Sequence, residues 1–75
     1  MKQQYQSLSL VAGANLKRVI EEVGLTQEEA AAKLHYSDGS CIRRLGRLGI
    51  TKIDEIQRIA DVLGVPFSEM IKPID

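Results

Sequence analysis

Hydrophobic residues recur at spacings of three and four along most of the chain, which is the pattern of amphipathic helices. Gly24 follows the first such segment, in the position where a left-handed glycine commonly ends a helix. We therefore predict a first helix over residues 10–23, preceded by a polar, flexible N-terminal arm over residues 1–9. The apolar stripe of this helix comprises Leu10, Ala14, Leu16, Val19, Ile20 and Val23.

A second helix has a clear start signal in the sequence. Thr26 is followed three residues later by Glu29, which is the spacing of a capping box. The run EEAAAKL at residues 28–34 consists of good helix formers. We expect a helix here whose narrow apolar face is made of Ala30, Ala31 and Leu34.

Two further helices are expected near the C-terminal end. Thr51 and Asp54 form a second, weaker capping pair, and Gly64 marks the end of the segment that they open. Pro66 fits the first position of a short final helix over residues 66–71. The apolar stripe of the longer helix is the best in the chain: Ile53, Ile56, Ile59, Ala60 and Leu63.

No segment alternates between apolar and polar residues at period two, so no strand is predicted. The fold class is therefore all-α, a compact arrangement of five short helices. We assign one domain to residues 10–72 and a C-terminal tail to residues 73–75.

The charge of the chain is balanced, but the charges are unevenly placed. Ten basic and ten acidic side chains give a formal net charge of zero, which is a poor overall signature for a nucleic-acid binder. Between Gly39 and Ile53, however, all charged residues are cations. A neutral protein can therefore still carry one basic face, here built from Arg43, Arg44, Arg47 and Lys52.

Little in the sequence suggests catalysis or a bound cofactor. His35 and Cys41 are the single histidine and the single cysteine, so a metal site or a disulfide within the chain is not expected. No glycine-rich phosphate loop is present. We expect no enzymatic activity, no cofactor, no small-molecule ligand and no membrane segment. The N-terminal residues do not read as a secretory signal, so we expect a cytoplasmic location.

Two stretches of the chain resemble the Cro- and lambda-repressor-like helix-turn-helix family, also called XRE-like. They are NLKRVIEEVGLTQEEAAAKL at residues 15–34 and IDEIQRIADVLGVPFSEMI at residues 53–71. The resemblance implies a five-helix domain in which the third helix, the reader helix, enters a groove of DNA. It also implies a small transcriptional regulator of the repressor type that occupies promoter or operator DNA.

The stretch between these two matches departs from the family pattern. His35 stands where the family usually has glycine in the turn before the reader helix. Counting without a gap places Cys41 and Arg44 at the core positions of that helix. One extra residue in the turn places Ile42 and Leu45 there instead. We prefer the second alignment, because burying an unpaired arginine is costly.

The start of the reader helix is left open by the sequence. In the preferred alignment the turn HYSDGS, at residues 35–40, is long, and Ser37 or Ser40 caps a helix over residues 41–46. The alternative is a turn of normal length with Ser37 as the cap and Gly39 inside the helix. In both cases His35 is a turn residue that tolerates a left-handed backbone.

The resemblance also implies which side chains meet DNA. It implies that Gln27, at the start of the second helix, contacts a phosphate. Arginine can bind guanine with two hydrogen bonds in the major groove, so the two adjacent arginines of the reader helix are the best candidates for base or phosphate contacts. The predicted DNA-binding residues are Gln27, Ser37, Ser40, Arg43, Arg44, Arg47 and Lys52.

The expected partner is double-stranded DNA, bound by a homodimer, because a single domain with about four cationic contacts binds weakly. Asp38 near the start of the reader helix opposes this interpretation, since its carboxylate repels phosphate. The alternative is a protein-interaction module with the same fold, such as an antirepressor, that docks on another regulatory protein.

Overall fold

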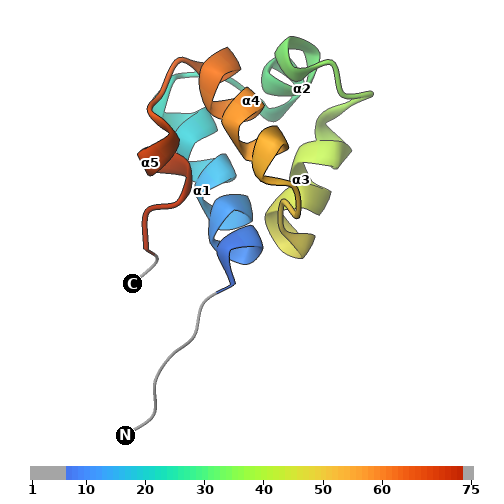
Figure 1. The fold of residues 1–75 in the computed structure, drawn as a ribbon. Coiled ribbons are helices and arrows are strands. Elements are labelled where there is room, and N and C mark those ends of the chain that lie inside the picture. The colour runs from blue at the N-terminus through green and yellow to red at the C-terminus, as the bar shows by residue number, and fades with distance from the viewer. Residues whose placement is uncertain (1–6, 74–75) are drawn as a thin grey trace, which may run out of the picture.

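The computed structural model of the chain describes residues 7–73. In this part of the chain all regular structure is helical and no strand is present, as the sequence predicts (Figure 1). The helices are α1 (Leu8–Glu22), α2 (Gln27–Leu34), α3 (Gly39–Leu48), α4 (Ile53–Leu63) and α5 (Phe67–Met70).

Helix α1 begins two residues earlier than predicted, at Leu8. Leu8 and Ser9, which we assigned to the N-terminal arm, are therefore helical, and the rest of that arm up to residue 6 lies outside the described residues. The predicted apolar stripe was also partly wrong, because Leu10, Ala14 and Val23 are exposed. The face that packs inward consists of Val11, Ala12, Asn15, Leu16, Val19 and Ile20.

The predicted start of α2 is confirmed in detail. The Thr26 side chain accepts from the Glu29 amide at 3.1 Å, and the Thr26 amide donates to the Glu29 carboxylate at 2.8 Å. These two bonds satisfy backbone amides that the first turn of a helix leaves free. The small face of Ala30, Ala31 and Leu34 is fully buried, so α2 packs closely on its neighbours.

Helix α4 has the expected core face but a different start. Its N-cap residue is Lys52, and no side chain caps it, so the predicted Thr51–Asp54 capping pair was wrong. Ile53, the first residue of α4, is 60% exposed and does not belong to the core face. The other four residues of the predicted stripe are buried, and Gly64 ends the helix with a φ of 76°.

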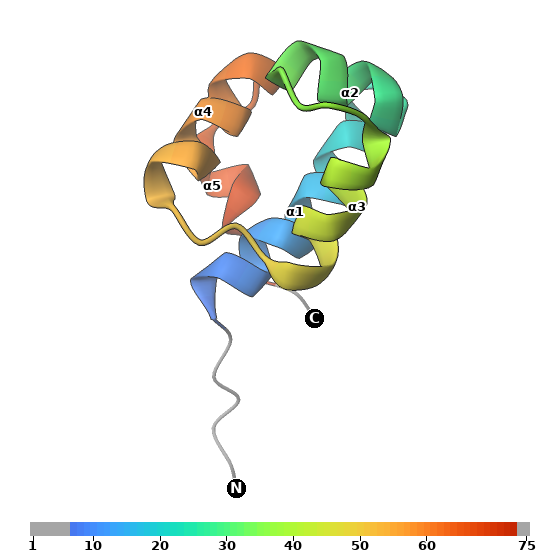
Figure 2. The same cartoon turned by 90° about the vertical axis from the view of Figure 1, so that its right-hand side faces the viewer.

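Helix α5 is shorter than the predicted helix over residues 66–71. Pro66 is its N-cap residue rather than its first helical residue. Met70 is the buried residue of this helix, and it joins a core to which α1, α2, α3 and α4 all contribute. The helices surround this core as a closed ring in Figure 2, with α1 behind and α4 facing α3 across it.

Glycine permits α1 and α3 to lie very close together. A Cβ atom on Gly13 would lie 2.4 Å from the carbonyl oxygen of Leu45, a distance that real Cβ atoms do not reach. Gly49 has a φ of 96°, and a Cβ atom there would lie 2.9 Å from the carbonyl oxygen of Ser9. The backbones of the two helices therefore meet at these glycines, which sets the position of α3 on the rest of the domain.

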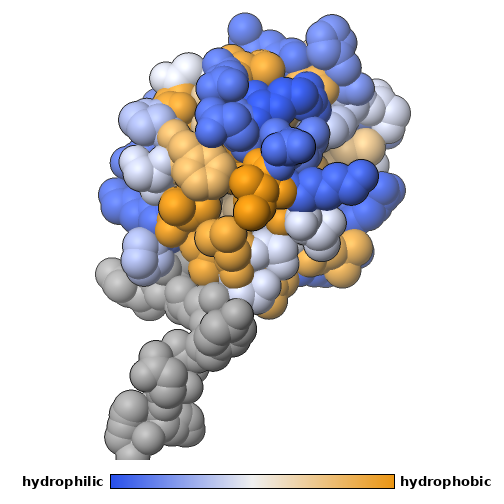
Figure 3. All heavy atoms as spheres, viewed as in Figure 1, coloured by the Kyte–Doolittle hydropathy of each residue, from blue (hydrophilic) through white to orange (hydrophobic). Residues whose placement is uncertain are grey.

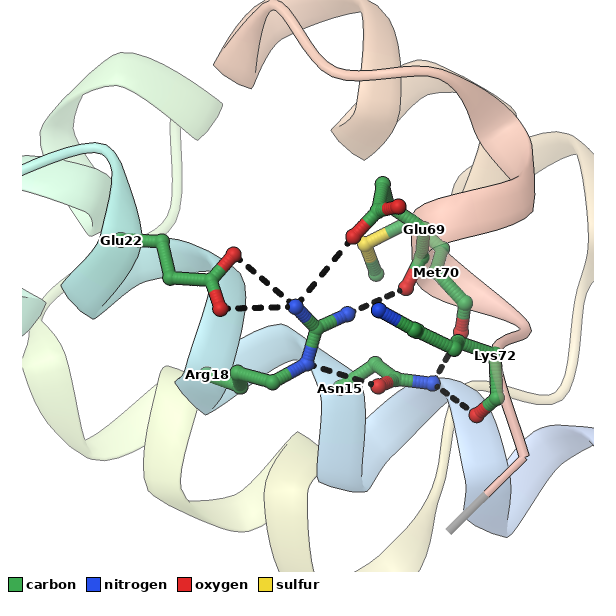
Figure 4. Close-up of polar contacts among 6 residues, drawn as sticks. All are labelled: Asn15, Arg18, Glu22, Glu69, Met70 and Lys72. Carbon is green, nitrogen blue, oxygen red and sulfur yellow. Dashed lines mark hydrogen bonds and ion pairs between the residues drawn. The ribbon is translucent and has the colours of Figure 1, made fainter.

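A buried polar residue ties α5 to α1 (Figure 4). The Asn15 side chain is 1% exposed and donates to the carbonyls of Met70, at 3.0 Å, and Lys72, at 2.8 Å. Its own oxygen accepts from Arg18, which also donates to the Glu69 carbonyl and pairs with the carboxylates of Glu22 and Glu69. This network satisfies the carbonyls that the end of α5 leaves free.

Candidate nucleic-acid interface

The alignment of α3 with one extra residue in the turn is confirmed. Ile42 is 1% exposed, and Leu45 packs against the core from a half-buried position. Cys41 is only half-buried, and Arg44 points into solvent. The turn between α2 and α3 spans residues 35–38 and is shorter than the predicted turn over residues 35–40, so Gly39 lies inside the helix, as in the alternative. Arg44 stays out of the core.

The predicted cap of α3 was wrong. Asp38, and neither Ser37 nor Ser40, is the N-cap residue, and its carboxylate accepts from the Ser40 amide at 2.9 Å. The helix then begins at Gly39 and runs to Leu48, longer than the predicted range of residues 41–46. Ser37, Asp38 and Ser40 can each cap a helix. Asp38 is the strongest hydrogen-bond acceptor among them because its side chain is charged.

A second carboxylate fixes the start of α3 from the neighbouring helix. Glu28 of α2 accepts from the Gly39 amide at 2.9 Å. A Cβ atom on residue 39 would lie 2.5 Å from that carboxylate oxygen, so a larger residue here would displace the end of the Glu28 side chain. Glu28 also lies in the first turn of α2, where the helix dipole favours an acidic side chain. Its contact with Gly39 depends on how α2 and α3 pack, so no pattern in the sequence predicts it.

The first turn of α3 therefore already carries negative charge. Hydrogen bonds from Ser40 hold the pKa of Asp38 below its usual range, so this carboxylate is charged at neutral pH. With Glu28 beside it, the amino end of α3 has its free amides satisfied by carboxylates. A phosphate group has no free amide to bind at this point.

One face of α3 is cationic. Ser40, Arg43, Arg44 and Arg47 follow each other at spacings of three, one and three residues, which places them along one side of a helix. Ile42 and Leu45 lie on the opposite side, against the core. The three arginines are exposed, and none has an ion pair within the described residues. We call Arg43, Arg44 and Arg47 the basic face of α3.

This basic face adjoins a concavity between α1, α2 and α3. Arg43 donates to the Gln27 side chain at 3.3 Å, which joins the predicted phosphate contact of α2 to α3. The concavity has a volume of about 360 Å³. Three of the residues that line it are cations and none is acidic. The lining consists of Gly13, Ala14, Lys17, Gln27, Ile42, Arg43, Gly46 and Arg47.

Lys17 belongs to this cationic surface, and sequence reasoning missed it. It is exposed on α1, three residues after Ala14, and both line the concavity. From the sequence Lys17 is one solvated lysine among several. Only the close packing of α1 on α3 brings it beside Arg43 and Arg47.

Two of the predicted contact residues lie away from the concavity. Ser37 is exposed in the turn, with its hydroxyl 3.2 Å from the Cys41 sulfur. Lys52 precedes α4 and lines a separate hollow with Leu45 and Glu55. The structure thus gathers Gln27, Arg43 and Arg47, keeps Ser40 and Arg44 on the same face of α3, and separates Ser37 and Lys52 from them.

A polar cluster that the sequence did not predict anchors the turn before α3 to α4. The Tyr36 hydroxyl donates to the Glu55 carboxylate, which also accepts two bonds from Arg58, at 3.0 Å and 2.6 Å. Arg58 holds the pKa of Glu55 below its usual range, while burial and the nearby carboxylate raise the pKa of Tyr36. The guanidinium also lies 5.5 Å from the centre of the Tyr36 ring, a cation–π distance.

Comparison with known proteins places this geometry in a family. A helix-turn-helix family model matches residues 16–70, which span α2, α3 and the surrounding helices. No match was found among curated proteins or among solved structures. Among the described residues, no helix is long and apolar enough to cross a membrane. Since the matched region covers most of the chain, the protein belongs to the Cro/lambda-repressor-like (XRE-like) helix-turn-helix family of DNA-binding regulatory domains.

Proposed function

We propose that the protein is a sequence-reading transcriptional regulator that represses by occupying promoter or operator DNA. The observation that carries this proposal is the basic face of α3, whose three arginines are exposed and free of ion pairs within residues 7–73. Solvated cations on the exposed face of a helix can meet phosphates and base edges in the major groove.

Each cation has a proposed role set by its place. Arg43 and Arg44, in the middle of α3, bind guanine edges at a specific site and phosphates on random-sequence duplex. Lys17, Arg47 and Gln27 surround the concavity and bind the phosphates on one side of the groove. Lys52 binds backbone further along, and Ser37 and Ser40 make the remaining polar contacts near the start of α3.

The carboxylates at the start of α3 shape which bases this helix accepts. Asp38 is exposed and charged, and a carboxylate there accepts a hydrogen bond from the amino group of cytosine but repels phosphate. Arg43 and Asp38 thus offer a donor and an acceptor on one helix. The few amide and hydroxyl side chains of α3 favour modest specificity, with part of it carried by DNA shape.

A titration of salt against binding of random-sequence duplex DNA tests this proposal. With about four cations on phosphates, we expect log K to fall against log salt with a slope of about −3 to −4 per monomer. Lys17→Ala lowers this slope by about one and weakens binding to all sequences alike. Absence of any salt-dependent binding at low ionic strength contradicts the proposal.

The carboxylates at the amino end of α3 favour one second candidate function. With Glu28 and Asp38 there, and with a net charge of zero, the same fold can serve as a protein-interaction module such as an antirepressor. In that case the basic face of α3 binds an acidic surface of another regulatory protein. The salt titration separates the two candidates, because this second function requires little or no binding to duplex DNA.

A further inference from the structure

The two ends of α3 are held to the rest of the domain by contacts of different kinds. Its backbone packs on α1 and α2, and no Cα atom of α3 lies within 8 Å of one in α4. The carboxyl half is fixed to α1, where Gly13 leaves room for the Leu45 carbonyl. The amino end lies beside α2 (Figure 2), and the atoms nearest to a Cβ placed on Gly39 belong to Glu28 and Gln27.

One hydrogen bond joins the amino end of α3 directly to α2. Gly39 is buried, and its amide donates to the Glu28 carboxylate at 2.9 Å. A buried amide without an acceptor is costly, so this bond favours the observed placement of the helix. Asp38 caps the same helix, but it bonds only to Ser40 and joins α3 to no other element. Among residues 7–73, Glu28 is the only side chain of another helix that bonds to the backbone of α3.

The turn before α3 is fastened separately. Tyr36 donates to Glu55 of α4, but two residues stand between Tyr36 and the first residue of α3. This bond fixes the turn and leaves the direction of the helix to the contacts of the helix itself. Figure 3 shows mainly hydrophilic side chains over the top of the domain, where α2 lies, in keeping with polar contacts at this end.

The direction of α3 decides where its arginines lie. At ~1.5 Å per residue, α3 is about 15 Å long. A rotation of about 15° around its carboxyl end moves its amino end by roughly 4 Å and Arg43 by roughly 2 Å, against a spacing of ~3.4 Å between base pairs. Arg43 stands one turn after Gly39 and donates to Gln27, the neighbour of Glu28. A tilt of α3 away from α2 therefore also breaks the contact between Arg43 and Gln27.

We propose that Glu28 is a positioning residue, which sets the direction of α3 through its bond to Gly39 and thereby decides which base pairs Arg43 and Arg44 reach. This inference rests on the proposed function. Glu28 acts through α3 rather than by touching DNA, and its negative charge opposes binding to any duplex. Its hydrogen bond and its charge therefore have opposite effects on DNA binding, and substitutions can separate them.

Three substitutions separate the hydrogen bond from the charge. Glu28→Gln keeps an acceptor for the Gly39 amide and removes the charge. Glu28→Ala removes both. Gly39→Ala keeps the charge but places a Cβ 2.5 Å from the Glu28 oxygen, which displaces that side chain, while alanine itself favours the helix. Glu21→Ala, an exposed change on α1, is the matched control for the loss of a glutamate.

Residual dipolar couplings of the backbone amides, measured without DNA, report the direction of α3 relative to α1. We expect wild-type couplings in Glu28→Gln and in Glu21→Ala. In Glu28→Ala and Gly39→Ala, which both break the bond, α3 should rotate by on the order of 10°, enough to move its amino end by roughly 2–3 Å. An unchanged direction of α3 in both of these variants overturns the proposal.

DNA binding is measured on a duplex that the wild-type chain selects from a random pool, and on the pool itself. We expect the preference for the selected duplex to fall about ten-fold in Glu28→Ala and Gly39→Ala, as for the loss of one bidentate base contact. Glu28→Gln should keep the preference and bind the pool slightly more tightly, because it lacks the charge. A loss of preference in Glu28→Gln as large as in Glu28→Ala overturns the proposal.

The two measurements distinguish failure of this inference from failure of the proposed function. If α3 rotates when the bond is broken but the wild type selects no DNA, the proposed function fails and the role of Glu28 in directing α3 stands. If the wild type selects DNA and both variants without the bond keep its preference, the role of Glu28 fails and the proposed function stands.

Discussion

Single residues show how this small domain satisfies its polar groups. Asn15 is the one buried polar side chain among the described residues, and it donates to the backbone carbonyls of Met70, at the end of α5, and of Lys72. The hydrogen bond from Tyr36 to Glu55 likewise joins the turn that precedes α3 to helix α4. Neither cluster has a periodic signature, because each joins residues far apart in the sequence. Both were therefore missed by sequence reasoning.

Replacing Asn15 by alanine tests the first cluster. We expect Asn15→Ala to lower the free energy of unfolding by about 2–3 kcal/mol, because two carbonyls and the Arg18 guanidinium lose their partner. Urea denaturation followed by circular dichroism measures this change. Ser68→Ala, an exposed change on α5, serves as the control. A loss under about 0.5 kcal/mol, the scatter of ordinary surface substitutions, would show that the network contributes little.

Because of the Glu55 carboxylate, the free energy of unfolding should fall when the pH is lowered. Its folded pKa lies below the ordinary value of 4.5, so the stabilisation is present above that pH and disappears as the pH falls through the folded pKa. Glu55→Gln should cost about 1 kcal/mol at pH 7 and progressively less below pH 4.5. Thermal unfolding at several pH values tests this. Glu21→Gln, an exposed change on α1, is the control, and a cost for Glu55→Gln that is independent of pH would contradict the assignment.

At the scale of helices, the spacing of apolar residues located each helix, but the residues that cap α3 and α4 were misassigned. All five helices were placed to within two residues at each end, although half of the predicted apolar stripe of α1 is exposed. The start of α3 was misassigned because Ser37, Asp38 and Ser40 can all cap a helix. The choice among them depends on Glu28 of another helix, which the sequence does not place nearby. Lys17 was missed for a similar reason, since only the packing of α1 on α3 brings it to the concavity.

Two glycines of this helix pair give a matched test of the packing. Gly13→Ala should destabilise the domain by about 1–3 kcal/mol, because its Cβ meets the Leu45 carbonyl at 2.4 Å. Gly46→Ala places its Cβ 3.7 Å from the Gly13 carbonyl, an ordinary contact, and should stabilise α3 by about 0.5–1 kcal/mol. Thermal denaturation of both variants measures the difference. Equal effects of the two substitutions would mean that the helices do not meet at Gly13.

At the scale of the whole molecule, a chain with no net charge separates its charges in space. The carboxylates of Glu28 and Asp38 lie at the amino end of α3, and the arginines follow along its exposed face. The glycines between α1 and α3 and the cluster at Tyr36 hold that face in a fixed position. We propose that the basic face of α3 binds DNA.

The most direct test is the salt dependence of duplex DNA binding for three forms of the chain. They are the wild type, the double variant Arg43→Ala, Arg44→Ala, and the control Lys33→Ala, which removes an exposed cation of α2 outside the concavity. We predict that the double variant weakens binding and reduces the log–log salt slope by about two, while the control changes neither by much. A double variant that binds DNA with the affinity and slope of the wild type would contradict the claim.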